Sequence, residues 1–495
     1  GNMKIKIRGY ELDPWQEEVV YASDKYTLLL AGAGTGKTFT ILGKIKYLIT
    51  SLNYQEEDIL CISFTNMATK QLKEMLAQEG YQKICVLTFH KLALLFLKDF
   101  NYSFVDSSNL LTFIIDEFFN YHVSNYPLLQ KMILRHFHIF SLSKVKSYQK
   151  FLKSKHYLKM QKLIIKIILL NKSNAKGFRD YYNNIAKYAS SNYLVAYLTL
   201  IIYYIYQVEC ESANMIDFDD ILYQAIEKIK TSKLKLWRFV LVDEYQDTSY
   251  LRFLFLKELL VKSKAKLLAV GDDYQSIYRF TGCDLSLFLN FSSWFAEASI
   301  KKIEKTYRNS QELINIASSF IMKNKKQLKK ELVSDKHLQK PIKIVFTFNK
   351  KRAFEKLVNI IPGTLLVLGR NNFDIYSFLN SNFRLENNKI DYCRATDKLI
   401  YYLTVHKAKG LEEDNVLVIN NEDALYGFPN QVVDAKILKD FYPQDNFLYE
   451  EERRLFYVAL TRTRNNVYLL TTFNPSCFIK ELLKDYPLEI EKIFI

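Results

Sequence analysis

The chain has 495 residues, of which 49% are apolar, 25% charged and 15% aromatic. This composition excludes a disordered protein, and the length predicts two to four domains. Lys and Arg outnumber Asp and Glu by 69 to 53, and the net charge of +16 favours a polyanionic partner, nucleic acid or an anionic membrane surface. A generally lysine-rich composition is the alternative explanation of this charge.

Cysteine usage and hydropathy bear on the compartment. No CxxC pair and no secretory signal are found, which argues against a zinc site and a disulfide framework and predicts a cytoplasmic protein with reduced thiols. The uncharged stretch YASSNYLVAYLTLIIYYIYQV at 188–208 has a strongly apolar part of only about 14 residues, and a membrane span needs roughly 20. We therefore expect a buried helix there and no membrane contact.

Residues 26–100 read as three strand–helix repeats. The apolar runs YTLLLAG, ILCISFT and ICVLTFH each precede a helix-like segment. This alternation predicts a parallel sheet with helices on both faces.

A glycine-rich turn, AGAGTGKT at 31–38, lies between the first strand and the first helix, as in a P-loop. Glycines let backbone N–H groups turn toward phosphate oxygens, Lys37 reaches the β and γ phosphates, and the Thr38 hydroxyl holds Mg²⁺. A turn without a ligand is the alternative. The residues predicted to cradle the nucleotide phosphates are Ala31, Gly32, Ala33, Gly34, Thr35, Gly36, Lys37 and Thr38.

From 101 to 210 the pattern becomes helical, with many lysines and aromatic residues, and we interpret it as a helical insertion. Strands return at WRFVLVDE, where Asp243 suits Mg²⁺ coordination and Glu244 can polarise an attacking water. A second α/β series follows from PIKIVF to NNVYLLTT. The sequence thus predicts an α/β protein with two domains, the first interrupted by helices.

Eight motifs in chain order resemble those of superfamily 1A helicases of the UvrD/Rep type, and the C-terminal half is most similar to the helicase IV-like members. They are LDPWQEEVV, AGAGTGKT, SFTNMATKQLKEM with LTFHKLAL, VDEYQDT, GDDYQSIYRFTG, EKTYRNS, LTVHKAKGLEEDNVLVI and EEERRLFYVALTRTR. The resemblance implies two RecA-like P-loop domains, the first at 3–100 and 211–297 and the second at 298–495, with the helical insertion at 101–210.

The resemblance also implies roles at the ATP site. Gln16 is expected to read the adenine edge, Tyr307 to lie against the base and Glu412 near the ribose. Arg308 is expected to point at the phosphates, Arg462 to act as the arginine finger and Gln275 to sense the γ-phosphate. ATP and Mg²⁺ are the expected cofactors.

Single-stranded nucleic acid needs a cationic groove and flat faces for its bases. Aromatic residues at strand ends supply candidate faces, and core packing is the alternative for each of them, above all for Phe89. Together with the residues that the resemblance implies, the expected contacts are Phe64, Thr65, Asn66, Thr88, Phe89, His90, Tyr278, Arg279, Phe280, His406 and Lys407. The lysines of 144–176 and 323–330 are either phosphate contacts or solvated helix faces.

The sequence departs from the family pattern in one large feature. The interval between Arg370 and His406 is too short for the 2B subdomain that the family usually carries there, so 2B is expected to be absent or vestigial. The resemblance implies an ATP-dependent 3′–5′ single-stranded DNA translocase and helicase that acts on single/double-strand junctions, and DNA repair is an expected role. The alternatives are an ATPase that remodels or strips protein–nucleic acid complexes, and a catalytically dead binding module. RNA stays open as a substrate, because stacking does not distinguish the two polymers. We expect a monomer.

Overall fold

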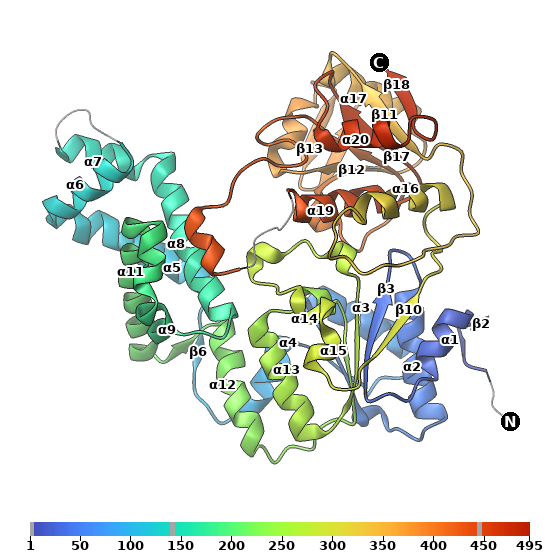
Figure 1. The fold of residues 1–495 in the computed structure, drawn as a ribbon, viewed down its shortest axis with the longest axis horizontal. Coiled ribbons are helices and arrows are strands. Elements are labelled where there is room, and N and C mark those ends of the chain that lie inside the picture. Colours follow the sequence, from blue (N-terminus) through green and yellow to red (C-terminus); the bar gives the residue numbers. More distant parts are fainter. Residues whose placement is uncertain (1–3, 139–143, 443–447) are drawn as a thin grey trace.

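The computed structural model describes residues 4–138, 144–442 and 448–495. Figure 1 shows one body around β3 and β10, a second around β11, β12 and β17, and a group of helices beside the first. The α/β class predicted from the sequence is confirmed, with two largely parallel sheets flanked by helices.

The first sheet has six strands in the order β10-β3-β9-β8-β4-β5, and each neighbouring pair is parallel. Its strands are β3 (Tyr26–Ala31), β4 (Ile59–Ser63), β5 (Cys85–Thr88), β8 (Phe239–Val242), β9 (Lys266–Gly271) and β10 (Ser299–Ile303). Its helices are α1 (Pro14–Val20), α2 (Lys37–Thr50), α3 (Asn66–Gln78), α4 (Phe89–Leu94), α12 (Phe218–Thr231), α13 (Tyr250–Ser263), α14 (Ser286–Leu289) and α15 (Phe291–Trp294).

Both faces of this sheet are buried. Side chains alternate along a strand, so Leu28 and Leu30 of β3 enter one apolar cluster while Leu29 and Ala31 enter another. Helices cover both clusters, as a parallel sheet requires. The carboxyl ends of the strands therefore meet at one edge, where the P-loop and the residues after β8 and β9 come together.

Strand β10 corrects the predicted domain boundary. The boundary at 297/298 assigned residues 299–303 to the second domain, but they pair with β3 at the edge of the first sheet. The reason is that an edge strand with alternating exposure carries no continuous apolar run for the sequence pattern to detect.

The segment between the strands of the first sheet is helical, as expected. Its helices are α5 (Ser107–Glu117), α6 (Pro127–His136), α7 (Lys144–Leu152), α8 (Lys155–Ser173), α9 (Phe178–Asn183), α10 (Ile185–Ser191) and α11 (Tyr193–Ser212). Among the described residues, α11 is the helix long and apolar enough to cross a membrane by length and composition, and half of its apolar window is buried inside the protein. Its inner face packs in the core of these helices, as the expected buried helix would.

The second sheet has the order β13-β14-β15-β12-β16-β17-β11-β18, antiparallel from β13 to β15 and parallel beyond. Its strands are β11 (Ile342–Phe346), β12 (Leu365–Gly369), β13 (Phe383–Glu386), β14 (Lys389–Tyr392), β15 (Ile400–Thr404), β16 (Glu413–Val418), β17 (Thr463–Thr471) and β18 (Glu491–Phe494). Its helices are α16 (Gln311–Ile321), α17 (Lys350–Ile360), α18 (Val405–Ala408), α19 (Glu450–Thr461) and α20 (Cys477–Asp485). The interval from Arg370 to His406 is occupied by β13, β14 and β15 of this same sheet.

Candidate active site and nucleic-acid interface

The P-loop is held in a shape that only glycine permits at two positions. Gly34 and Gly36 have φ values of +69° and +75°. A Cβ on Gly34 would collide with the Cβ of Arg308, and one on Gly36 would lie 2.7 Å from Nε2 of Gln16. Thr35 Oγ1 donates to the carbonyl of Gly32 at 2.8 Å and fixes the turn. The backbone N–H groups before α2 thus form an anion site that two other candidate residues approach closely.

Lys37 lies between the two carboxylates that follow β8. Its Nζ is 3.0 Å from Asp243 Oδ1 and 2.9 Å from Glu244 Oε1. Burial alone would lower the pKa of Lys37, but the charges of Asp243 and Glu244 raise it well above its usual range. Glu244 adopts φ +53°, a strained conformation for a residue with a side chain, and its N–H donates to Asp243 Oδ1 at 2.8 Å. The strain therefore lies at the carboxylate predicted to activate water.

A second layer of polar residues holds Glu244, and sequence reasoning missed it. Gln246 Nε2 donates to Glu244 Oε2 at 2.6 Å, while Lys409 Nζ lies 2.9 Å from Asp247 and 4.0 Å from Glu244. Burial opposes ionisation of Glu244, yet Lys37 and Lys409 hold its pKa well below the usual range. The sequence position of Lys409 could have indicated its role, because Lys409 belongs to the same HKAKG stretch as the expected nucleic-acid contacts.

Gln275 joins the two sheets. Its Nε2 donates to Asp272 Oδ2 at 2.8 Å, and its Oε1 accepts from Arg462 Nη2 at 3.0 Å. Arg462 is 1% exposed, and its Nε donates to the carbonyl of Val458. Burial, followed by the charge of Arg308, lowers the pKa of Arg462, yet an arginine keeps its charge at neutral pH. The side-chain amide of Gln275 thus connects the buried guanidinium of Arg462, just before β17, to Asp272 at the end of β9.

Residues 306–308 dock directly on the P-loop. Thr306 Oγ1 donates to the carbonyl of Ala33 at 2.8 Å, and the Tyr307 N–H donates to that of Gly34 at 2.8 Å. Arg308 Nε donates to Glu412 Oε2 at 2.7 Å, which brings these two predicted residues together. The ring of Tyr307 is exposed beside Gly36.

Gln16 lies next to this group, but its amide is partly used. Its Oε1 accepts from the N–H of Asp13 at 2.9 Å in the capping box of α1, and its Nε2 is 3.5 Å from the carbonyl of Gly36. The phenol of Tyr307 donates to Asp13 Oδ2 at 2.8 Å. The adenine-reading role of Gln16 stays a prediction. Its amide lies beside Gly36, at the end of the P-loop where α2 begins.

Most of these groups, but not Gln16, line one cavity of about 650 Å³. Its walls include the whole P-loop with Thr38, the acids after β8, and Arg308, Lys409 and Arg462 from the second sheet's part of the chain. In the described ranges, no cluster of three or more His, Cys, Asp or Glu side chains could hold a metal by itself. Mg²⁺ commonly takes one or two protein ligands together with substrate phosphates, and the hydroxyl of Thr38 and the carboxylate of Asp243 are oxygen donors of that kind. The residues present therefore fit Mg²⁺ bound with a nucleotide.

Aromatic rings gather beside this cavity. The ring centroids of Tyr278 and Phe280 lie 6.0 and 5.7 Å from that of His406, and Tyr278 donates its hydroxyl to the carbonyl of His406 at 2.8 Å. Phe280 is 42% exposed, and Lys407 is also exposed. Burial, then Arg370 and Lys409, lower the pKa of His406 to about 4, so the ring is neutral at pH 7. This cluster combines the exposed ring of Phe280 and two half-buried rings with the exposed cation of Lys407.

On the first sheet, the expected contacts separate into surface and core residues. Thr65 and Asn66 are exposed at the start of α3, where Thr65 Oγ1 accepts from the N–H of Ala68 at 3.1 Å. Phe64 is half-buried and also lines the cavity. His90 is half-buried, with its ring 4.7 Å from that of Phe218.

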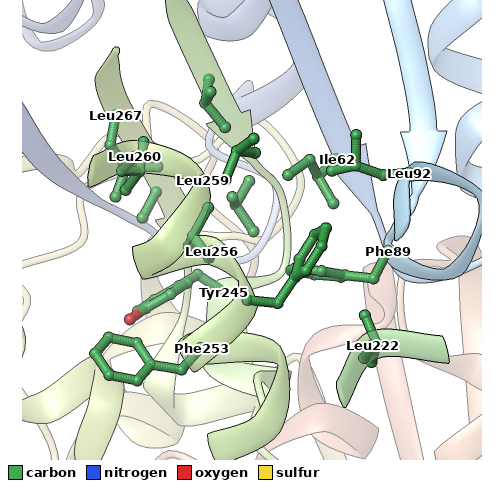
Figure 2. Packing of buried hydrophobic residues seen from close by; sticks show 14 of the residues in the cluster. Ile62, Phe89, Leu92, Leu222, Tyr245, Phe253, Leu256, Leu259, Leu260 and Leu267 are labelled. Carbon is green, nitrogen blue, oxygen red and sulfur yellow. The ribbon is translucent and has the colours of Figure 1, made fainter. Parts of the chain in front are cut away.

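The nucleic-acid contacts expected of Thr88 and Phe89 are wrong, because both side chains are buried. Phe89 is 1% exposed and lies in the core with Ile62, Leu92 and Leu256, as Figure 2 shows. Thr88 is 6% exposed, and its hydroxyl caps α4. Both side chains are buried because α4 begins directly after β5 and directs them toward the interior.

The nucleic-acid contact expected of Arg279 stays a prediction. Its guanidinium faces Asp434 at 3.6 Å and Glu451 at 3.9 Å and lies over the ring of Tyr442. Lys330, at the end of the lysine-rich run 323–330, is buried against Asp272 and Asp273. The buried acids Asp272 and Asp273, which the sequence pattern cannot show, decide the case of Lys330.

The arrangement defines a P-loop nucleotide hydrolase whose site is completed by arginines from a second α/β sheet. Residues 12–296 match the UvrD/REP helicase N-terminal domain. The chain belongs to this family, which makes it an ATP-dependent helicase by class and confirms the resemblance seen in its motifs.

Relatives agree along most of the chain. It is similar to DNA helicase IV of Escherichia coli (strain K12), with 26% identity over 98% of this chain and 72% of that protein. It is 28% identical to the ATP-dependent DNA helicase Rep of the same strain, over 70% of this chain and 48% of Rep. It is also 28% identical to the ATP-dependent DNA helicase PcrA of Bacillus subtilis (strain 168), over 65% of this chain and 41% of PcrA. The chain thus matches about half the length of the Rep and PcrA relatives.

Proposed function

We propose that this protein is an ATP-dependent DNA helicase that moves 3′ to 5′ along single-stranded DNA and separates duplex strands. The observation that carries the proposal is the double hydrogen bond of Gln275 to Asp272 and Arg462. The same turn continues within three and five residues to Tyr278 and Phe280. A change beside Gln275 during hydrolysis can thereby alter the position of rings that stack on bases. The direction of movement rests on the family resemblance.

The chemistry follows from the side chains around the cavity. Lys37 exchanges its two carboxylate partners for phosphate oxygens, and Glu244 accepts a proton from the attacking water. Arg308 and Arg462 stabilise the charge on the transferring group, and the loss of such a finger costs about 10³-fold or more in rate. Mg²⁺ held by Thr38 and Asp243 would neutralise charge on the phosphate oxygens.

For the nucleic acid, we propose a groove that follows the edge of both sheets. Phe64, Tyr278, Phe280 and His406 provide faces for bases, each worth roughly 1–3 kcal/mol. Thr65, Asn66, His90 and Lys407 lie at the same strand ends. We propose single-stranded DNA and its junctions with duplex as the substrate, bound by a monomer in the cytoplasm.

We further propose that residues 3–100 and 211–303 form the ATP-binding RecA-like domain, that 101–210 is its insertion, and that 304–495 is the second RecA-like domain. Strand β10 supports the shifted boundary. The strands between Arg370 and His406 belong to the second sheet, which supports the absence of 2B.

The same observation favours a second candidate function. Without 2B, the protein could use its motor to displace proteins from nucleic acid, with little strand separation. Strand displacement and removal of a bound protein from single-stranded DNA, measured at equal ATP turnover, separate the two functions.

The experiment that tests the proposal measures ATP hydrolysis with and without single-stranded DNA or RNA, together with displacement of 3′- and 5′-tailed duplexes. We expect stimulation by DNA and displacement from 3′ tails. Lys37→Ala, which leaves the loop glycines in place, should abolish turnover. No stimulation by either polymer would refute the motor, and displacement only from 5′ tails would reverse its direction.

A further inference from the structure

Residues 434–442 form a strap that leaves the second sheet and enters the helical insertion. The strap contains the short turn η9 (Lys436–Asp440), and Figure 1 shows this orange-red segment beside α8. Ile437, Leu438 and Phe441 are almost fully buried in the same apolar cluster as the insertion helices. The strap is therefore part of the core of the insertion, although it lies more than 200 residues further along the chain.

The contacts of Phe441 show how firmly the strap is seated. Its ring centroid lies 4.6 Å from that of Tyr188 and 6.3 Å from that of Tyr181. Asn174 Nδ2 donates to its carbonyl at 2.7 Å. Lys187 also approaches Asp440, at 3.7 Å. Aromatic packing and a part-buried hydrogen bond thus act together at one residue.

The insertion is attached to the first sheet mainly by polar contacts. Two short strands, β6 (Ser103–Phe104) and β7 (Met215–Ile216), pair where the chain enters and leaves the insertion. Lys172 of α8 lies 3.1 Å from Asp217 and 2.7 Å from Asp220 at the start of α12. The apolar core of the insertion is a cluster separate from those of the first sheet. The strap is therefore an apolar contact of this core with a distant part of the chain, while Ala175 packs against the apolar cluster of the first sheet.

The far end of the strap contacts the turn that carries Gln275. Tyr442 donates its hydroxyl to Asp434 Oδ2 at 2.6 Å, and the guanidinium of Arg279 lies 5.1 Å from the centre of the Tyr442 ring. The N–H of Arg279 donates to Glu451 at the start of α19 at 3.1 Å. Arg279 is thus held between the strap and the second sheet, four residues from the amide that contacts Arg462.

We propose that the strap positions the helical insertion relative to the second sheet, and that Arg279 is the positioning residue that links the strap to the Gln275 turn. A displacement of the insertion then changes the geometry of the turn, and a change in the turn moves the insertion. The proposal rests on the proposed helicase function for its effect on activity, but the positioning itself is independent of that function.

Distances between spin labels test the positioning. With Cys393 and Cys477 replaced by Ser, labels at Leu128→Cys on α6 and Leu488→Cys beyond α20 report the insertion against the second sheet; both sites are strongly exposed. We expect a narrow distance distribution for the wild-type strap and a broadened one for Phe441→Ala. The matched control is Phe348→Ala, which removes an equally large but exposed ring from the second sheet. An unchanged distribution in Phe441→Ala refutes the proposal.

Coupling is tested with a milder variant in case Phe441→Ala does not fold. Tyr442→Leu removes both the ring that faces Arg279 and the hydroxyl that donates to Asp434. We expect the number of strands displaced per ATP hydrolysed to fall at least about fivefold, as for a typical coupling between sites, while ATP turnover without DNA is unchanged. An unchanged ratio refutes the link through Arg279. If the wild-type protein shows no DNA-dependent activity, the proposed function fails, and the spin-label distances alone decide the strap.

Discussion

Replacing Gln275 with Ala removes the one side chain that hydrogen-bonds both Asp272 and Arg462. Arg462 is 1% exposed, so its Nη2 cannot replace the lost acceptor with bulk water. Losing a hydrogen bond to a buried charged group costs about 1.5–3 kcal/mol. If that contact is needed only while phosphate is transferred, turnover should fall roughly 10- to 150-fold.

The assay compares ATP turnover and strand displacement, with nucleotide and DNA affinities measured separately. We expect both affinities to stay near the wild-type values and the number of strands displaced per ATP to fall. Gln431→Ala is the control, because this half-buried glutamine donates to Asp423 in an exposed hydrogen bond away from the cavity. A Gln275→Ala protein that binds both ligands and still displaces the wild-type number of strands per ATP would refute the coupling role.

Three further changes test the surroundings of the site. Lys409→Ala leaves the half-buried carboxylates of Asp247 and Glu244 without this cation and should lower the free energy of unfolding by about 1–3 kcal/mol, measured by urea denaturation, whereas the exposed Lys407→Ala should leave it unchanged. Phe89→Ala should lower the same free energy of unfolding by about 3–5 kcal/mol, because its ring is buried. Phe280→Ala should instead weaken binding of single-stranded DNA by roughly 1–3 kcal/mol. The opposite pattern would mean that the core and surface assignments are exchanged. Burial and neighbouring cations lower the pKa of His406 from 6.5 to about 4, so the unfolded chain binds the proton first. Its contribution to stability should be complete above pH 6.5 and be lost as the pH falls toward 4, and His406→Gln should reduce that slope; an unaltered slope would contradict the burial of a neutral ring.

The P-loop and the two acids of the nucleotide site could be predicted because each of them is a short, continuous stretch of the sequence. The P-loop and the pair Asp243 and Glu244 each follow directly from a strand, and a parallel sheet must bring strand ends to one edge. Gln275 and the arginines required the order of the motifs as well. Fold class and the helical insertion followed from hydropathy period alone.

The failures have a common physical cause. Phe89 has the residue type of a nucleic-acid interface, but neighbours distant in the sequence bury its ring in the core. Lys409 was missed for the same reason, since its partner Asp247 lies 162 positions away along the chain. Strand β10 lacks a continuous apolar run. A local sequence pattern shows which side chains have the chemistry that a site needs. Tertiary contacts decide which of these side chains are free to contact a ligand.

The contact between Lys37 and Glu244 has a consequence for the timing of hydrolysis. In this structure, Lys37 and Lys409 keep the pKa of Glu244 low, which makes its carboxylate a weak base. When Lys37 turns to the phosphates, Glu244 loses its nearest cation and gains a nearby anion, and both changes raise its pKa. Base strength should therefore rise only in the loaded site. The pH profile of kcat reports the complex and that of kcat/KM the free protein, so the acid limb of kcat should lie at the higher pH. Coincident acid limbs would show that Lys37 does not control Glu244.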